Sequence, residues 1–194
     1  MPNANTRIYD KTIDRAAMLR LYENRSVGKV ELIIDGHAVR VDKLIKDSRL
    51  QGRDFNTFLK RLDDEIIGTM ADAHNVSSRS LLDLFREQTD YTTKTLDSAV
   101  GKIWKTQKPP RRIAEEIVLK QPLYSNMTLD QGWAGIGKNE RIRIEGLIRK
   151  GIAEGQTSNA IADTIMKDGY KATKNQARGL VVTATTSVLG EKGW

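Results

Sequence analysis

Apolar residues recur every three or four positions along most of this chain, which is the spacing of amphipathic α-helices. The clearest stripe follows Asp54, a suitable capping residue, and consists of Phe55, Phe58, Leu59, Leu62, Ile66 and Met70. Similar spacing predicts four further helices: one over about residues 10–24, one that begins at residue 81, one around residues 96–104 and one that begins after Pro110. The first of these would turn Ile13, Ala17, Met18 and Leu21 toward a core. Cap-rich residues 75–80 predict a break, and residues 122–138, with three glycines, predict a loop. The pattern predicts a mainly α, multi-helix domain.

Residues 30–41 have a strand-like rather than a helical pattern of apolar and polar residues, and this pattern predicts a β-hairpin. Two β-rich segments, Val30–Ile34 and His37–Val41, flank Asp35-Gly36, a strong signal for a two-residue type I′ turn. Such a turn would pair Glu31 with Arg40 across the strands. It would also gather Val30, Leu32, Ile34, Val39 and Val41 on one face. We expect that face to pack on helices, because an isolated hairpin is marginally stable in water.

The last third of the chain begins with two predicted helices. The apolar set of the first comprises Ile142, Ile144, Leu147, Ile148 and Ile152. Gly155 then stands where a left-handed C′ residue is expected. Thr157 or Ser158 caps the second helix, which Gly169 is expected to end. Its apolar residues are Ile161, Ile165 and Met166.

A final helix is predicted from the capping-box pair Thr173 and Gln176. Ala177, Leu180, Val181, Ala184 and Val188 share one of its faces. Because Leu180, Val181 and Val182 are consecutive, one face cannot bury all three. Intramolecular packing is one interpretation. The other is a docking face, for a partner or for further C-terminal chain, made of Leu180, Val181, Val182 and Val188.

This order of helices and turns resembles the phage Mu F-like minor head protein family, also called the phage head morphogenesis domain. The resemblance runs through Lys150–Gly155, Ser158–Ile165 and Gln176–Val188, roughly the last third of the chain. Where the family often has Arg-Thr-Glu, this chain has Val182-Thr183-Ala184 and shares only the threonine. The division that follows is an N-terminal part, 1–89, with helices and the hairpin, and a head-morphogenesis-like helical part, 90–194. One continuous domain is the alternative.

The resemblance implies a structural minor head protein of a tailed phage, which is not an enzyme. Such proteins associate in few copies with the portal or inner capsid and assist head assembly, DNA packaging or genome delivery. The implied partners are the portal or major capsid protein and packaged DNA, with a homo-oligomer around the portal as a further expectation. The implied locations are the capsid interior or portal vertex of the virion, and the host cytoplasm during assembly. Family members usually continue beyond such a helix, and some carry an enzyme domain there, so we expect a fragment, a processed product or a member that ends early.

The charge of the chain adds nucleic acid to the expected partners. The formal net charge is +7, which indicates either a solvated basic surface or contact with a polyanion. Five cations fall within eleven residues around Pro109-Pro110, and we expect phosphate contacts from Lys102, Lys105, Lys108, Arg111 and Arg112. A solvated helix end is the alternative for this segment. The alternative function is a helical nucleic-acid-binding protein. No apolar run is long enough to predict a membrane span.

Candidate catalytic and cofactor sites are few. Gly132–Lys138 has the spacing of a phosphate-binding loop, but Asn139 replaces the required Ser or Thr, and no buried strand precedes it. We expect an ordinary loop there, anchored by Trp133 and Ile136. His37 and His74 are far apart, and cysteine is absent, so no metal site is predicted. Asp63-Asp64-Glu65 reads as a solvated helix face rather than an acid–base pair. No enzyme, cofactor or metal function is predicted.

Overall fold

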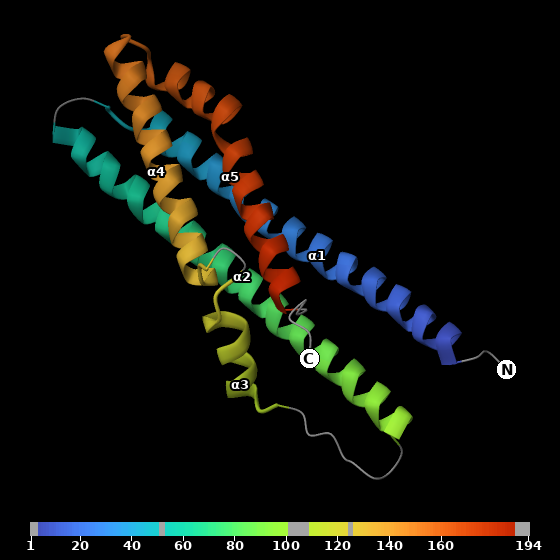
Figure 1. Cartoon of the computed structure of the whole chain (residues 1–194). Helices are drawn as coiled ribbons and strands as arrows, with labels where there is room; N and C mark the ends of the chain where they lie inside the picture. The colour runs from blue at the N-terminus through green and yellow to red at the C-terminus, as the bar shows by residue number, and fades with distance from the viewer. Residues whose placement is uncertain (1–3, 51–52, 101–108, 124–125, 189–194) are drawn as a thin grey trace.

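Four long helices make up most of the described part of the chain. The computed structural model describes residues 4–50, 53–100, 109–123 and 126–188 (Figure 1). The long helices are α1 (Ala4–Lys46), α2 (Arg53–Val100), α4 (Leu129–Ala153) and α5 (Ser158–Val188). Between α2 and α4 lie the short α3 (Arg111–Glu115) and a π-helical turn, η2 (Glu116–Lys120). The predicted mainly α, multi-helix fold is therefore confirmed.

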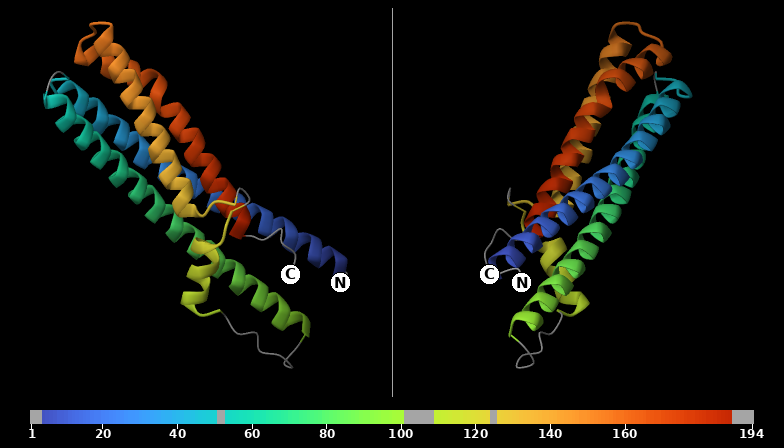
Figure 2. Two further views of the ribbon diagram at one scale, coloured as in Figure 1. Left: turned by 60° about the vertical axis from the view of Figure 1, so that its left-hand side comes forward. Right: turned by 90° about the vertical axis from the view of Figure 1, so that its right-hand side faces the viewer.

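The long helices pack as an up-down-up-down bundle (Figures 1 and 2). α1 packs on α2 and α5, and α4 packs on the same two helices, so α1 and α4 occupy opposite corners. Apolar side chains from all four helices form one continuous core, and the most deeply buried include Ile34, Phe58, Leu62, Trp133, Ile144 and Ile161. None of the described helices is apolar over a stretch long enough to cross a membrane.

The helices are less enclosed at the end of the bundle that lies away from the α1–α2 and α4–α5 turns (Figure 2). The first part of α1 and the last part of α2 extend beyond the α4–α5 pair (Figure 2). Ala17 and Leu21 are consequently exposed, Leu21 to 69%, so the expectation that they face the core is wrong. Met18 is half-buried, and Ile13 lies outside the residues whose side chains are described.

Residues 30–41 form the middle of α1, and the predicted β-hairpin is wrong. The helical period collects four β-branched residues on one face, each at most 1% exposed: Val30, Ile34, Val41 and Ile45. Leu32 and Val39, which the hairpin would have buried with Val30, are 72% and 63% exposed. Asp35 and Gly36 weaken the helix by about 1–2 kcal/mol together. Burying four branched side chains contributes about 1.5–3 kcal/mol each and outweighs that loss.

The polar residues of the same stretch link helices instead of strands. Glu31 was expected opposite Arg40, but its Oε1 lies 3.3 Å from Nη2 of Arg178 on α5. Arg40 donates from Nε to Oε1 of Glu65 on α2 at 2.7 Å. Asp35, in the supposed turn, pairs with Lys174 on α5. These contacts hold α1 to both of its neighbours.

α5 continues through the predicted breaks. It runs from Ser158 to Val188, so the stop at Gly169 and the capping box of Thr173 and Gln176 are wrong. Its buried face extends without interruption through Ile161, Ile165, Tyr170, Thr173, Ala177, Val181 and Ala184. The Thr173 hydroxyl donates to Glu140 on α4 rather than capping a helix. Tertiary packing along this face overrides the local stop signals.

α2 is also continuous across its predicted break at 75–80, and the expected domain boundary at 89/90 falls inside it. The Ser77 hydroxyl bonds the carbonyl of Ala73 at 2.8 Å, which a helix accommodates. The last ten residues of the predicted loop, 129–138, belong to α4. Its start is a capping box in which Gln131 N–H donates to Thr128 Oγ1 at 3.3 Å and Thr128 N–H donates to Gln131 Oε1 at 2.9 Å.

The turn between α4 and α5 matches its prediction. Gly155 has a φ of 69°, the left-handed conformation expected at C′. Its N–H bonds the carbonyl of Ile152 at 3.0 Å, and Gln156 N–H bonds that of Gly151 at 2.9 Å. Thr157 is the cap of α5, since its Oγ1 accepts from Ala160 N–H at 3.3 Å. This Schellman turn fixes the reversal of the chain.

Gly36→Ala tests the helix over residues 30–41. An added Cβ would meet only the flexible end of Arg40, with Nη1 at 3.2 Å. We expect the free energy of unfolding in urea to rise by about 0.5–1 kcal/mol, the gain for replacing a helical glycine. Gly68→Ala, at an open position in α2, is the matched control and should give a similar gain. A type I′ turn needs positive φ at Gly36, so a loss of about 1 kcal/mol or more would contradict the helix.

Candidate functional site

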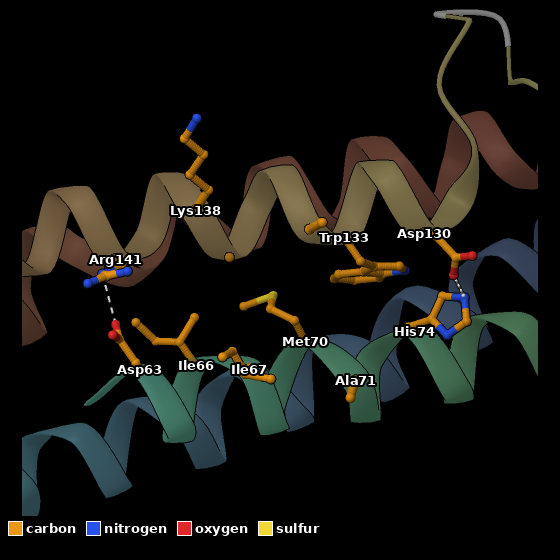
Figure 3. Close-up of a pocket in the computed structure, with 12 residues that line it drawn as sticks. Asp63, Ile66, Ile67, Met70, Ala71, His74, Asp130, Trp133, Lys138 and Arg141 are labelled. Atoms are coloured by element: carbon orange, nitrogen blue, oxygen red, sulfur yellow. Dashed lines mark ion pairs between the residues drawn. The ribbon is translucent and has the colours of Figure 1, made fainter. Parts of the chain in front are cut away.

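A groove with a volume of about 510 Å³ lies between α2 and α4 (Figure 3). This volume lies within the range of ligand and peptide pockets. The groove is lined by Asp63, Ile66, Ile67, Met70, Ala71, His74, Asp130, Trp133, Ala134, Gly137, Lys138 and Arg141. Apolar side chains occupy its middle, and charged ones its two ends (Figure 3).

Small residues create the groove. At Gly137 an added Cβ would lie 3.0 Å from Cγ of Met70, so α4 crosses α2 closely there. Ala71 on α2 and Ala134 on α4 are exposed beside this crossing and leave its outer side unfilled. Ile67 borders the same space and is 67% exposed. The helices therefore touch at their inner faces and diverge outward into an apolar trough.

Trp133 forms a rigid part of the floor. Its side chain is 2% exposed and its indole Nε1–H donates to Ser77 Oγ at 3.1 Å. Ser77 can accept this bond because its own hydroxyl donates to a backbone carbonyl of α2. The buried indole therefore has its polar atom satisfied, and the aromatic surface keeps one orientation.

Ion pairs close the two ends of the groove (Figure 3). Asp63 Oδ1 lies 2.8 Å from Arg141 Nε at one end. His74 Nε2 lies 2.7 Å from Asp130 Oδ1 at the other. These pairs are substantially solvated and contribute little stability, about 0–1 kcal/mol each. Their position matters more, because they place a paired carboxylate at each end of an apolar surface.

Lys138 lies three residues before Arg141 on α4, near one end of the groove (Figure 3). Its side chain is exposed and points away from α2 (Figure 3), with no ion pair among the described residues. Gly132–Lys138 lies inside α4, so the expected ordinary loop is wrong. In a helix the backbone N–H groups of this segment bond preceding carbonyls instead of surrounding a phosphate.

A layer of buried polar side chains crosses the bundle beneath the groove. Glu140 on α4 has a side chain that is 0% exposed, and its Oε2 accepts from Arg143 and from the Thr173 hydroxyl. The Arg143 guanidinium also lies over the ring of Tyr170 on α5, 5.9 Å from its centroid. A buried carboxylate is tolerated because a cation and a hydroxyl bond it.

α1 and α2 complete this layer. His37 is 0% exposed, with Nδ1 3.1 Å from Glu65 Oε1 and 3.0 Å from Thr69 Oγ1. Because an ionised carboxylate only accepts, Nδ1 carries the proton of a neutral His37. The imidazole meets the Tyr170 ring edge-on, with centroids 5.7 Å apart. All four long helices thus contribute to the polar layer, which we define as His37, Glu65, Thr69, Glu140, Arg143, Tyr170 and Thr173.

Burial dominates the protonation behaviour of the polar layer. Burial lowers the pKa of His37 below 6.5, although its bond to Glu65 opposes the change. Burial tends to raise the pKa of Glu65, but bonds from Arg40 and His37 bring it below 4.5. Burial, followed by the charge of Glu140, raises the pKa of Tyr170. Within the polar layer, four buried atoms have no hydrogen-bond partner among the described residues: His37 Nε2, Glu140 Oε1, Arg143 Nη1 and the Tyr170 hydroxyl.

The residues predicted to dock a partner lie mostly within the bundle. Leu180 and Val181 are buried, at 9% and 1% exposed, while Val182 and Val188 are half-buried against the core. A partner could reach only the last two to any extent. Their docking role stays a prediction, and this packing favours the intramolecular interpretation of Leu180 and Val181.

The predicted phosphate-contacting cations are described only in part. Lys102, Lys105 and Lys108 lie outside the described residues. Arg111 and Arg112 are exposed at the start of α3, and Arg111 donates to Glu115 at 2.8 Å. Their contact with nucleic acid stays a prediction. Among the described residues, no group of three or more His, Asp or Glu side chains could hold a metal ion.

Lowering the pH tests the burial of His37. The unfolded chain binds the histidine proton near pH 6.5, whereas the folded protein binds it only at lower pH. Stability from this group is therefore complete above pH 6.5 and is lost below it, with a slope of up to about 1.4 kcal/mol per pH unit. Glu65 adds a loss in the same direction below pH 4.5.

We expect the melting temperature to fall between pH 7.0 and 5.5, and to fall less in His37→Gln. His74→Gln removes the other histidine, which is half-exposed at the groove end, and should keep the wild-type decrease. An equal decrease in His37→Gln and wild type would show that His37 does not titrate as its burial requires.

Comparison with known proteins adds nothing to the resemblance to phage head morphogenesis proteins that the sequence indicates. No protein-family model matches the chain, no curated protein matches it, and no solved structure matches its fold. The likeness to phage head morphogenesis proteins therefore rests on the residues of the α4–α5 hairpin alone.

Proposed function

We propose that this chain is a structural minor head protein of a tailed phage, and that it binds a neighbouring subunit of the head through the groove between α2 and α4. The groove is the observation that carries the proposal. It presents an apolar floor about two helical turns long, bounded by charges, on a bundle whose core is already filled. The expected result of binding is to hold the chain at the portal or inner capsid during assembly or DNA packaging.

The shape and chemistry of the groove favour a helix as the bound element. Helix-binding grooves accept apolar side chains at i, i+3 or i+4, and i+7, with polar contacts at the rim. Ile67, Met70 and Trp133 supply the apolar surface, and the two ion pairs mark its ends. The small residues Ala71 and Ala134 would let the backbone of a third helix approach closely.

The helical hairpin of α4 and α5, which carries the resemblance, also positions one wall of the groove. Within Lys150–Gly155 and Ser158–Ile165, the Schellman turn sets the chain reversal. At Gly151 an added Cβ would lie 2.4 Å from Ile161 Cγ1, so the two helices are in close contact just beside the turn. The family-like residues thereby position α4, which is one wall of the groove.

Binding to purified portal and major capsid proteins of the phage that carries this chain tests the function. We expect wild type to bind at least one of them by interferometry. Ile67→Asp should raise the dissociation constant about tenfold or more, because it would bury an unpaired carboxylate. Ile142→Asp is the control, since Ile142 is 60% exposed on α4 but does not line the groove. Absence of binding to both proteins, or equal loss in both variants, would contradict the proposal.

A helical nucleic-acid-binding protein is the second candidate, supported by the net charge of +7 and by the exposed Arg111 and Arg112. Binding of labelled duplex DNA at 50 and 200 mM salt separates the two. An affinity that falls steeply with salt, together with no affinity for either head protein, would favour this candidate.

A further inference from the structure

The hydrogen bonds of the polar layer fall into two separate halves. On the α1–α2 side, His37 Nδ1 lies 3.1 Å from Glu65 Oε1. On the α4–α5 side, Glu140 Oε2 accepts from Arg143 and from the Thr173 hydroxyl. Among the described residues, no hydrogen bond of the layer joins one half to the other. The side chains at the centre of the bundle are therefore bonded within each half but not across it.

The ring of Tyr170 lies between the two halves. It meets the His37 imidazole edge-on, with centroids 5.7 Å apart, and the Arg143 guanidinium carbon lies 5.9 Å from its centroid. Neither contact is a hydrogen bond, and the Tyr170 hydroxyl is buried without a partner among the described residues. Burial raises the pKa of Tyr170, and the charge of Glu140 is the next cause, so this carboxylate is also close to the ring.

The four unbonded atoms of the layer differ in what they require. His37 Nε2 is an acceptor, because Nδ1 carries the proton, and Glu140 Oε1 is also an acceptor. Arg143 Nη1 can only donate, whereas the Tyr170 hydroxyl can do either. His37, Glu140 and Tyr170 are at most 5% exposed. The large majority of such buried atoms in proteins bond another protein group or an ordered water.

A water molecule fits this mixed set of atoms better than an ion does. Water can donate to His37 Nε2 and Glu140 Oε1 while it accepts from Arg143 and Tyr170, and internal waters typically make about three hydrogen bonds. A bound anion would face the Glu140 carboxylate and the lone pair of His37. A bound cation would face the Arg143 guanidinium. The chemistry of the four atoms therefore selects a neutral ligand that both donates and accepts.

We propose that the polar layer binds internal water between its two halves, with His37 Nε2 and Glu140 Oε1 as its acceptors and Arg143 Nη1 and the Tyr170 hydroxyl as its donors. The water links His37 on α1 to Glu140 on α4, which occupy opposite corners of the bundle. It thereby joins the α1–α2 pair to the α4–α5 pair through hydrogen bonds at the centre of the core.

Tyr170→Phe tests the proposal by the sign of its effect on stability. If the hydroxyl bonds water, its removal deletes a hydrogen bond, and the equilibrium constant for unfolding in urea should rise about two- to tenfold. If the hydroxyl is unbonded, the variant loses only an unsatisfied polar group and should be as stable as wild type or more so. That second result would overturn the proposal. Tyr22→Phe is the matched control, since its hydroxyl donates to Glu87 outside the layer.

NMR on the full-length folded chain detects the water directly. We expect a cross-relaxation signal from long-lived water at the two carbon-bound ring protons of His37 that flank Nε2. In Tyr170→Phe the water keeps three partners and no tyrosine hydroxyl is left to exchange with solvent, so the signal should remain. Tyr22→Phe should leave it unchanged. Absence of the signal in wild type, or its loss in Tyr170→Phe, would overturn the proposal, because the second result would identify the hydroxyl itself as the source.

Discussion

The charge of Glu140 must be satisfied inside the bundle, and the arrangement of the helices follows from that constraint. A carboxylate with a fully buried side chain is strongly destabilising unless it is bonded. Arg143 supplies the cation from the same helix, and Thr173 supplies a hydroxyl from α5. The Arg143 bond lies within α4, but the Thr173 bond forms only when α4 and α5 are in one register. The polar layer thus selects one alignment of helices whose apolar faces would otherwise tolerate several.

The same layer extends to the other two helices through His37 and Glu65. Close glycine contacts then fix how near the helices lie, at Gly151 against Ile161 and at Gly137 against Met70. The second of these brings α2 and α4 together at their inner faces, and the small residues outside the crossing leave the groove. The surface that we assign to binding is therefore a consequence of how the core is packed.

The helical periodicity of the chain was readable from sequence, and so was the Gly155 turn, because each depends on local preferences. The errors have one origin. Asp35-Gly36, the cap residues 75–80 and Gly169 are strong local breakers, yet long buried faces run through all three positions. At residues 30–41, Val30, Ile34 and Val41 fit both the period of two of a strand and the period of 3.6 of a helix. Only Leu32 and Val39, which the hairpin would bury and the helix exposes, distinguish the two patterns. Tertiary packing decided between these patterns.

The candidate site was harder to predict. Trp133 and Gly137 were noticed only as parts of a loop, and their side-by-side position with Met70 depends on a helix far away in sequence. Glu140 stood four residues before Ile144 on an apolar face, which is a usable signal for a buried polar group. The exposure of Leu32 and Val39 was missed because the predicted hairpin placed both on its buried face.

A double-mutant cycle on Glu140 of α4 and Thr173 of α5 tests the role of the polar layer most directly, because their hydrogen bond crosses between the two helices. The free energy of unfolding is measured for wild type, Glu140→Leu, Thr173→Val and the double variant. We expect Glu140→Leu to lower it by about 2–3 kcal/mol, less than for a fully buried pair because Arg143 is 26% exposed. The double variant should lose less than the sum of the two single losses, with a coupling energy of about 1–2 kcal/mol. Losses that simply add would show that the two side chains do not act together, and the polar layer would not be what aligns α4 with α5.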